Sequence, residues 1–141
     1  EIDYDIITVL QRNARTTIKQ IGLEVGLTPP AIAERIRKLE ENKVILGYYA
    51  KVDPIKLSKN LIAFININVP PEIYIQFTKY CVEQKWITSH FRVMGVYNAM
   101  LHVHLHDSEQ LRQLLDELKQ FGTTNTAIVL STEFSNKPIK L

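Results

Sequence analysis

The apolar positions of this chain follow two different periods, and the period changes near position 53. Before that point apolar residues recur every three or four positions, which is typical of amphipathic helices. From Leu61 onward they alternate with polar residues, which is typical of strands that bury one face. We therefore expect two domains, residues 1–53 and residues 61–141, joined by a linker over residues 54–60.

Three helices are expected in the first domain. An apolar stripe predicts the first helix over residues 3–13. Thr17 and Gln20 have the spacing of a capping box, which predicts the start of a second helix, and Gly26 ends that helix. Thr28 is expected to cap the third helix, which carries a proline at its first position.

Two glycines lie at the junction between the second and third helices. A glycine inside a helix costs about 1 kcal/mol relative to alanine, so Gly22 indicates a position where another element packs closely. Gly26 supplies a residue that tolerates positive φ in the turn. A helix-turn-helix needs both features. The segment from Val44 to Val52 then reads as extended, so the pattern predicts a winged variant of the helix-turn-helix.

The distribution of charged residues indicates a binding partner for the first domain. The net charge of +2 is too small to indicate nucleic-acid binding by itself. Between Arg12 and Lys38, however, six basic residues stand against two acidic ones, a local excess of four. Such a basic segment in a nearly neutral chain indicates local contact with a polyanion. The alternative is a solvated helix face with ion pairs four residues apart, such as Glu34 with Lys38.

We expect the first domain to bind double-stranded DNA at an operator. The third helix would enter the major groove, and the start of the second helix would face a phosphate. For Arg35 two interpretations stay open, a contact with DNA or an internal ion pair with an acidic residue of the first helix such as Asp5. The candidate DNA-binding residues are Arg15, Thr16, Thr17, Thr28, Pro30, Ala31, Glu34, Arg35, Arg37 and Lys38.

The second domain has the element order βαββαβ, which predicts a ferredoxin-like fold and makes the chain α+β. The strands are expected over residues 61–69, 87–93, 99–106 and 126–134. One helix is expected over residues 71–84, and Ser108 is expected to cap another that ends at Phe121-Gly122. The first strand is apolar on both faces, with Ile65 on one and Phe64 on the other. The helices can cover only one face, so a second copy of the sheet is the simplest cover for the other, and we expect a homodimer.

Composition excludes several other classes of protein. Hydrophobic residues make up 45% and charged residues 23% of the 141 positions, which is normal for a folded domain. No apolar run approaches the roughly 20 residues that cross a membrane, and the opening residues do not resemble a signal peptide. The single cysteine, Cys81, excludes an intrachain disulfide and fits a cytoplasmic protein.

Three histidines alternate along the third strand of the second domain. His102, His104 and His106 would project from one face, where they could bind a metal or lie in the dimer contact. We favour the contact, because no nearby cysteine or paired carboxylate completes a metal site. No nucleophile–base pair or phosphate-binding glycine loop is present, so we expect neither an enzyme nor a cofactor.

These features together resemble the leucine-responsive and asparagine-responsive regulators, the Lrp/AsnC or feast/famine family. The segments that carry the resemblance are Asp3 to Ile7, Leu10 to Arg15, Val25 to Thr28, Arg35 to Glu40, Val44 to Tyr48, Val52 to Pro54, Gly95 to Asn98 and Thr124 to Leu130. The resemblance implies a cytoplasmic prokaryotic transcriptional regulator. Its second domain, of the RAM or ACT-like type, would form dimers that can assemble into octamers, and would bind a small effector, usually an amino acid.

The resemblance also places the effector, at two segments that end strands. The implied effector-binding residues are Gly95, Val96, Tyr97, Asn98, Thr123, Thr124, Asn125 and Thr126. The family usually has acidic residues at the positions of Val96 and Asn98, so no carboxylate is available there for an amino-acid ammonium. We therefore expect weak or amide-selective binding; the alternative is that these are ordinary turn residues.

Two further departures concern glycines. Lys43 stands where the family usually has glycine after the recognition helix, and Asn42 is the alternative left-handed cap. Ser58 replaces a glycine of the linker.

Two alternative functions start from the same resemblance. Siroheme decarboxylase subunits share the two-domain plan, but a proline-rich stretch follows their first helix, whereas Asn13 to Ile18 is polar here. That difference favours the regulator. The other alternative is an effector-binding dimer that no longer binds DNA.

Overall fold

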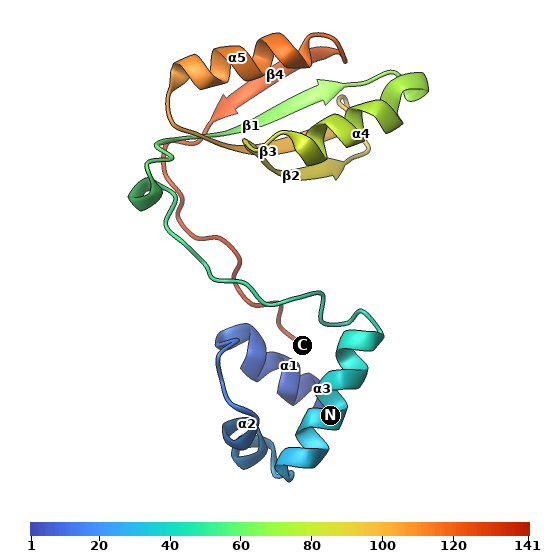
Figure 1. Ribbon diagram of the computed structural model, residues 1–141, viewed down its shortest axis with the longest axis vertical. Coiled ribbons are helices and arrows are strands. Elements are labelled where there is room, and N and C mark those ends of the chain that lie inside the picture. The colour runs from blue at the N-terminus through green and yellow to red at the C-terminus, as the bar shows by residue number, and fades with distance from the viewer. The chain divides into compact units, whose positions relative to one another are not determined.

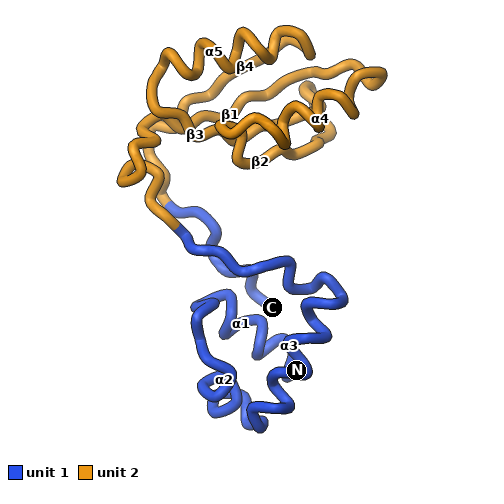
Figure 2. Tube along the Cα trace, viewed as in Figure 1, with its two compact units in different colours: residues 1–51, 134–141 blue, residues 52–133 orange.

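The computed structural model describes residues 1–141 and divides them into two compact units (Figure 2). One unit contains residues 1–51 and 134–141, and the other contains residues 52–133. The last segment, residues 134–141, thus lies with the N-terminal helices, although the sequence analysis assigns it to the second domain. Each unit has its own hydrophobic core.

The first unit contains the three predicted helices, α1 (Ile2–Arg12), α2 (Ile18–Val25) and α3 (Pro29–Glu41) (Figure 1). Their apolar stripes meet in one core, whose buried residues are Ile6, Val9, Ile21, Ile32 and Leu39. Each stripe recurs at helical spacing, so one face of every helix is buried and the opposite face stays in solvent. None of the helices of either unit combines the length and apolar character needed to cross a membrane.

The predicted start and end of α2 are confirmed. Thr17 Oγ1 accepts a hydrogen bond from the Gln20 amide at 3.1 Å, and Gln20 Oε1 accepts one from the Thr17 amide at 3.1 Å, so the capping box is complete. Gly26 has φ of 79°, a left-handed conformation that a glycine adopts without strain. Thr28 precedes α3 as its N-cap residue, but its side chain makes no capping hydrogen bond.

The end of α3 differs from the expectation. Asn42 has φ of −80°, so it is not the left-handed cap, and Lys43 takes the left-handed conformation instead with φ of 59°. This reversal lets the amides of Val44 and Ile45 donate to the carbonyl of Leu39 at 2.9 and 3.1 Å. The helix C-terminus therefore requires positive φ at this position, whichever residue the sequence supplies.

The segment after α3 is extended but contains no strand, so the helix-turn-helix has no β-sheet wing. A strand needs a backbone partner. The C-terminal tail contacts this segment through a side chain, since Lys51 Nζ donates to the carbonyl of Ser135 at 2.9 Å.

The second unit is ferredoxin-like, as predicted. Its elements are β1 (Leu61–Asn68), α4 (Tyr74–Glu83), β2 (Ile87–Arg92), β3 (Ala99–Leu105), α5 (Ser108–Leu118) and β4 (Thr123–Ile128), with short 3₁₀ turns at Ile55–Leu57 and Pro71–Ile73. The strands form one antiparallel sheet in the order β2-β3-β1-β4. Figure 1 shows α4 and α5 on the same face of this sheet.

Two boundaries in this unit were predicted wrongly. The fourth strand covers Thr123–Ile128 instead of residues 126–134, because its pairing with β1 begins at Asn68 and Thr123. The N-cap of α5 is Asp107, whose carboxylate accepts from the Gln110 amide at 3.0 Å, and not Ser108. Aspartate is as good an N-cap as serine, so the presence of Ser108 does not by itself decide which residue caps the helix.

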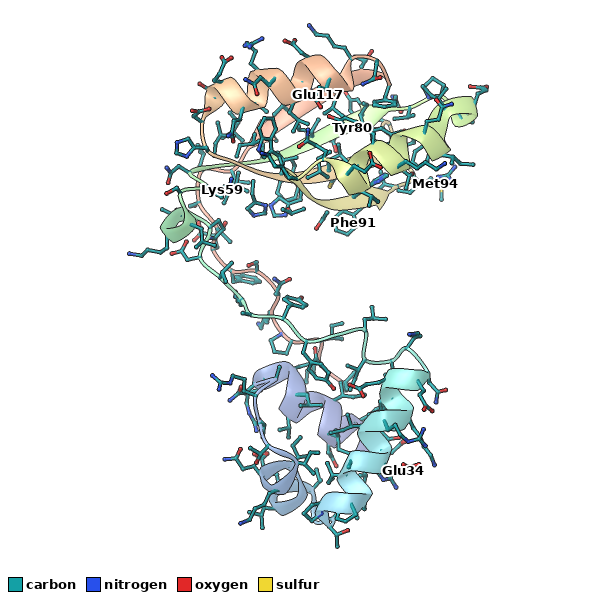
Figure 3. The ribbon with its side chains drawn as sticks, viewed as in Figure 1. Glu34, Lys59, Tyr80, Phe91, Met94 and Glu117 are labelled. Atoms are coloured by element: carbon teal, nitrogen blue, oxygen red, sulfur yellow. The ribbon has the colours of Figure 1, made fainter.

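Alternation along the central strands separates a buried face from an open face. On β1 the residues Ala63, Ile65 and Ile67 are fully buried beneath the helices, whereas Phe64 is only half-buried. The two helices that cover the buried face, α4 and α5, are joined by a hydrogen bond in which Tyr80 Oη donates to Glu117 Oε1 at 2.6 Å (Figure 3).

The single cysteine, Cys81, is buried among the core residues. Burial raises the pKa of its thiol to about 12, so Cys81 acts as a packing residue.

Candidate nucleic-acid interface and effector site

The third helix presents one continuous exposed face. Pro30, Glu34, Arg37 and Lys38 are all exposed, and Ala31 is half-buried at the border of this face. Figure 3 shows Glu34 on the side of α3 away from α1 and α2. An exposed helix face next to a short turn is the surface that a helix-turn-helix inserts into the major groove.

One exposed residue of α3 was missed by the sequence analysis. Ala33 is exposed and lies one turn after Pro30. A small apolar side chain there permits close approach to base edges or thymine methyl groups. Its helical position relative to Pro30 was the signal that could have identified it.

The structure decides the open question about Arg35. Its guanidinium Nη1 lies 2.9 Å from Asp3 Oδ1, so Arg35 joins α3 to α1 as an internal strut. The partner is Asp3 and not Asp5. The pair is only partly buried, so its contribution to stability is modest, about 1 kcal/mol or less.

Two other arginines of the basic segment are also paired. Arg12 Nη2 lies 3.0 Å from Glu24 Oε2. Arg37 contacts Glu34 at 2.6 Å and also binds Glu41. The hydrogen bond from Arg37 lowers the pKa of the Glu34 carboxyl below its usual value. Half of the basic segment is therefore neutralised within the protein.

The remaining cations have no carboxylate partner. Arg15, Lys19 and Lys38 form no ion pair and are exposed. Lys19 was not among the predicted DNA-binding residues, although its place in the first turn of α2 was a signal. Unpaired cations around an exposed recognition helix are the groups that neutralise phosphates and release counterions.

The corner before α2 is organised by Asn13. Its side-chain oxygen accepts from the Arg15 amide at 3.0 Å, and its carbonyl accepts from the Thr16 hydroxyl at 2.7 Å. Thr17 is occupied by the capping box. The side chains of Thr16 and Thr17 thus shape the corner, while the Arg15 side chain and the first amides of α2 are available to an anion.

The turn of the helix-turn-helix depends on Gly22. The amides of Gly26 and Leu27 both donate to the Gly22 carbonyl, at 2.8 and 3.1 Å. A Cβ at Gly22 would lie 2.5 Å from the Leu27 carbonyl oxygen. The predicted packing reason for this glycine is confirmed, and the close neighbour is the backbone of the turn.

The two segments expected to bind an effector come together at one end of the sheet. Asn68, the last residue of β1, pairs with Thr123 at the start of β4. Its side chain also donates to the carbonyl of Val96 at 2.8 Å and accepts from the amide of Asn98 at 3.1 Å. Asn68 therefore links the turn between β2 and β3 to the start of β4.

Asn98 is fully engaged by the protein. Its side-chain oxygen accepts from the Val69 amide at 2.9 Å, and its side-chain nitrogen donates to the Val69 carbonyl at 2.7 Å. A carboxylate could accept but not donate here, which explains why an amide suits this position. The groups left for a ligand are the turn backbone, Tyr97, Thr123 and Asn125. Thr124 and Thr126, which were also predicted to bind the effector, pair with buried Ile67 and Ile65 and therefore lie on the face that the helices cover.

Sequence reasoning missed Asn66 and Asn68. Both lie on the open face of β1, and Asn66 pairs with Asn125 of β4. They could have been identified from the sequence, because these two amides alternate with buried Ile65 and Ile67 and interrupt the run of hydrophobic residues in the strand. With Asn98, four asparagines thus lie at this end of the sheet.

The histidine stripe lies across the open face. The His102 ring stacks on Phe64 with a centroid distance of 4.5 Å, and His104 Nδ1 shares a hydrogen bond with the Thr88 hydroxyl at 2.7 Å. His106 Nδ1 is 2.8 Å from the Ser58 carbonyl oxygen. No group of three or more histidine, cysteine or acidic side chains is arranged to hold a metal ion.

Two domain families match the chain in the same order as the two units. An AsnC-type helix-turn-helix domain matches residues 1–40, and an Lrp/AsnC ligand-binding domain matches residues 62–139. The HTH-type transcriptional regulator YezC of Bacillus subtilis is 33% identical, with 94% of each chain covered. The HTH-type transcriptional regulator FL11 of Pyrococcus abyssi is also 33% identical, covering 99% of this chain and 96% of its own. The solved structure of Bacillus subtilis LrpC has 26% identity and a TM-score of 0.88, with 97% of each chain covered.

Proposed function

Because the chain belongs to the Lrp/AsnC family of helix-turn-helix transcriptional regulators, we propose that it binds an operator through α3 and changes that binding when a small metabolite occupies its second unit. The observation that carries the DNA-binding part is the exposed face of α3, bordered by cations without carboxylate partners. Arg15, Lys19 and Lys38 are free to contact phosphates, while Pro30 and Ala33 are small or apolar enough to approach bases.

The proposed DNA contacts divide into two kinds. The side chains of Arg15 and Lys38 neutralise phosphates and position the protein. The start of α3, with Thr28, Pro30 and Ala31, faces base edges and provides the sequence preference. Arg35 supports α3 from behind through Asp3, so its substitution should change DNA binding by tilting the helix.

The proposed effector site is the end of the sheet where Asn68 joins the two loops. We assign to it the backbone groups of Gly95 and Val96, the Tyr97 ring, and the side chains of Thr123 and Asn125, which share the open face with Asn68. Because the Asn98 side chain is hydrogen-bonded to the backbone of Val69, this end of the site is rigid. The site offers hydrogen-bonding groups but no carboxylate. This composition suits a polar, amide-containing amino acid better than leucine.

We further propose a homodimer through the open face of the sheet, from which larger assemblies such as octamers can be built. Phe64, Met100 and His102 are half-buried there, and Phe91 is 53% exposed. Figure 3 shows Phe91 on the side of the sheet away from α4 and α5. A second copy would cover these apolar and aromatic side chains.

The alternative enzyme function has less support. The relatives reported above are named as transcriptional regulators, and the helix-turn-helix retains its capping box, its left-handed turn and an exposed recognition face. With DNA as its target, we propose that the protein acts in the cytoplasm of a prokaryotic cell.

The test is a selection of genomic DNA fragments by the purified full chain, repeated with each of the twenty amino acids. We expect enrichment of a small set of sequences, and a change in enrichment with one polar amino acid. A matched selection with Arg15→Ala and Lys38→Ala combined should lose the enrichment. Equal recovery of all fragments by the wild-type chain would contradict the proposal.

For the effector, calorimetry on Tyr97→Ala and Thr123→Val separates this site from others. Binding of the responsive amino acid should weaken in both variants and should persist in Val82→Ala, which changes an exposed residue of α4. Unchanged binding in the first two variants would place the effector elsewhere.

A further inference from the structure

A hollow lies in the ferredoxin-like unit and shares no lining residue with the proposed effector site. It has a volume of about 470 Å³ and lies between α4 and β2, which is an edge strand of the sheet. Its lining residues are Tyr74, Ile75, Thr78, Lys79, His90 and Arg92. Two of them are cationic, none is acidic, and the volume suits a small molecule.

Arg92 is unusual among the arginines of this protein. Four of the six arginines form ion pairs with carboxylates, the exceptions being Arg15 at the DNA-binding corner and Arg92. Arg92 instead lies over the ring of Tyr74, with its guanidinium carbon 4.5 Å from the ring centroid. Stacking on an aromatic face restrains the guanidinium and leaves its N–H groups free to bind an anion.

The rest of the hollow supplies hydrogen bonds beside this cation. The Tyr74 hydroxyl and His90 Nε2 share a hydrogen bond of 2.9 Å. Burial lowers the pKa of His90, so its ring is neutral near pH 7 and keeps one donor and one acceptor nitrogen. Lys79 adds a second cation, which forms no ion pair.

An apolar wall completes the hollow. Ile75 lines the hollow and is 75% exposed, so the rest of this unit leaves most of its side chain uncovered. A ligand with a short hydrocarbon chain would cover it and gain about 25 cal/mol per Å² of buried apolar area.

We propose that this hollow binds a small organic carboxylate without an ammonium group, such as a 2-oxo acid. The carboxylate binds the fork of Arg92 in a bidentate manner with Lys79 beside it. The oxo oxygen accepts a hydrogen bond from the Tyr74–His90 pair, and the hydrocarbon chain lies on Ile75. An amino acid of the same skeleton would bring its ammonium group close to two cations with no carboxylate to receive it.

The experiment compares two ligands of one carbon skeleton, 4-methyl-2-oxopentanoate and L-leucine, by calorimetry and by amide chemical shifts of the full-length chain. We expect the oxo acid to bind about tenfold more tightly than leucine, with shift changes centred on Thr78 and His90. Arg92→Gln should weaken this binding at least about tenfold. Arg112→Gln, which removes an arginine already paired with Glu109, should leave it unchanged.

The proposal is overturned by no binding of the oxo acid at concentrations up to about 20 mM, by equal binding of leucine at the same residues, or by an affinity that Arg92→Gln leaves unchanged. Inorganic phosphate serves as the third ligand. Phosphate binding as tight as that of the oxo acid would also overturn the carboxylate assignment, because the hollow would then be a general anion surface. The proposal is independent of DNA binding, and each readout is made without DNA.

Discussion

Gln11 and Ile139 are separated by 128 positions and form a reciprocal pair of hydrogen bonds. The Gln11 side-chain amide donates to the Ile139 carbonyl at 2.9 Å and accepts from the Ile139 amide at 2.8 Å. A glutamine side chain thus acts as a short strand partner for the C-terminal tail. This pairing fastens residues 134–141 to α1 within the first unit.

The first prediction concerns this fastening. Gln11→Ala should release the tail and lower the local stability of the pair by about 1–2 kcal/mol, because two hydrogen bonds are lost. Hydrogen exchange at the Ile139 amide measures this directly, and the amide should change from protected to fast. Gln76→Ala, at an exposed position of α4, is the control. Equal protection of Ile139 in wild type and Gln11→Ala would contradict the pairing.

The second prediction concerns Lys43, whose φ is 59°. Lys43→Gly should stabilise the end of α3 by about 0.5–1 kcal/mol, because glycine adopts this conformation without the Cβ penalty. Exchange at the Val44 and Ile45 amides, which bond to Leu39, should slow. Lys43→Ala is the matched control, since it removes the same side chain but keeps the Cβ. The prediction fails if both variants have the same effect.

Gly22 gives the third prediction. Gly22→Ala places a methyl group 2.5 Å from the Leu27 carbonyl oxygen, so the turn must shift. We expect a loss of about 2 kcal/mol, seen as faster exchange of the core amides of Ile21 and Ile32, together with weaker DNA binding. Gly47→Ala is the control, because nothing lies within 4 Å of its added Cβ. A Gly22→Ala variant as stable as Gly47→Ala would contradict the prediction, because it would show that the turn can shift without a loss of stability.

The fourth prediction distinguishes free from paired cations on α3. Lys38→Ala should weaken binding to specific and random DNA alike and should reduce the salt slope by about 0.9, the value for one phosphate contact. Arg37→Ala should have a smaller effect, because Arg37 is already bound to Glu34 and Glu41. Titrations at several salt concentrations measure both slopes. A larger effect of Arg37 would show that its ion pairs open on DNA.

The fifth prediction is a loss of dimer stability in acid. Burial lowers the pKa of His102, with a further contribution from His104, and burial with the charge of Lys59 lowers that of His104. A histidine whose folded pKa lies below its unfolded value stabilises the folded state fully above pH 6.5 and loses that contribution as the pH falls. The proposed contact deepens this burial.

We therefore expect the dimer dissociation constant to rise about tenfold as the pH falls from 7.5 to 5.5. Light scattering or analytical sedimentation measures this constant. His102→Gln and His104→Gln combined should flatten this dependence while retaining polar side chains. A dimer of the same affinity at both pH values would place these histidines outside the contact.

The local elements of this protein could be predicted from the sequence because their causes are local. The capping box joins Thr17 and Gln20, which are only three positions apart, and the left-handed turn at Gly26 depends on one residue. The alternation of Ala63, Ile65 and Ile67 likewise follows from the strand period alone. The order of these elements then left few topologies, of which the ferredoxin-like one is realised.

Only the tertiary structure decided which distant groups meet. Arg35 has Asp3 as its partner across 32 positions, Asn98 is engaged by Val69 across 29, and Gln11 holds Ile139 across 128. In each case several side chains of suitable chemistry compete for one partner, and the choice depends on where packing places their backbones. The same physical reason separates the free cations from the paired ones. The charge of a residue belongs to its sequence, but its availability to DNA depends on the neighbours that the fold provides.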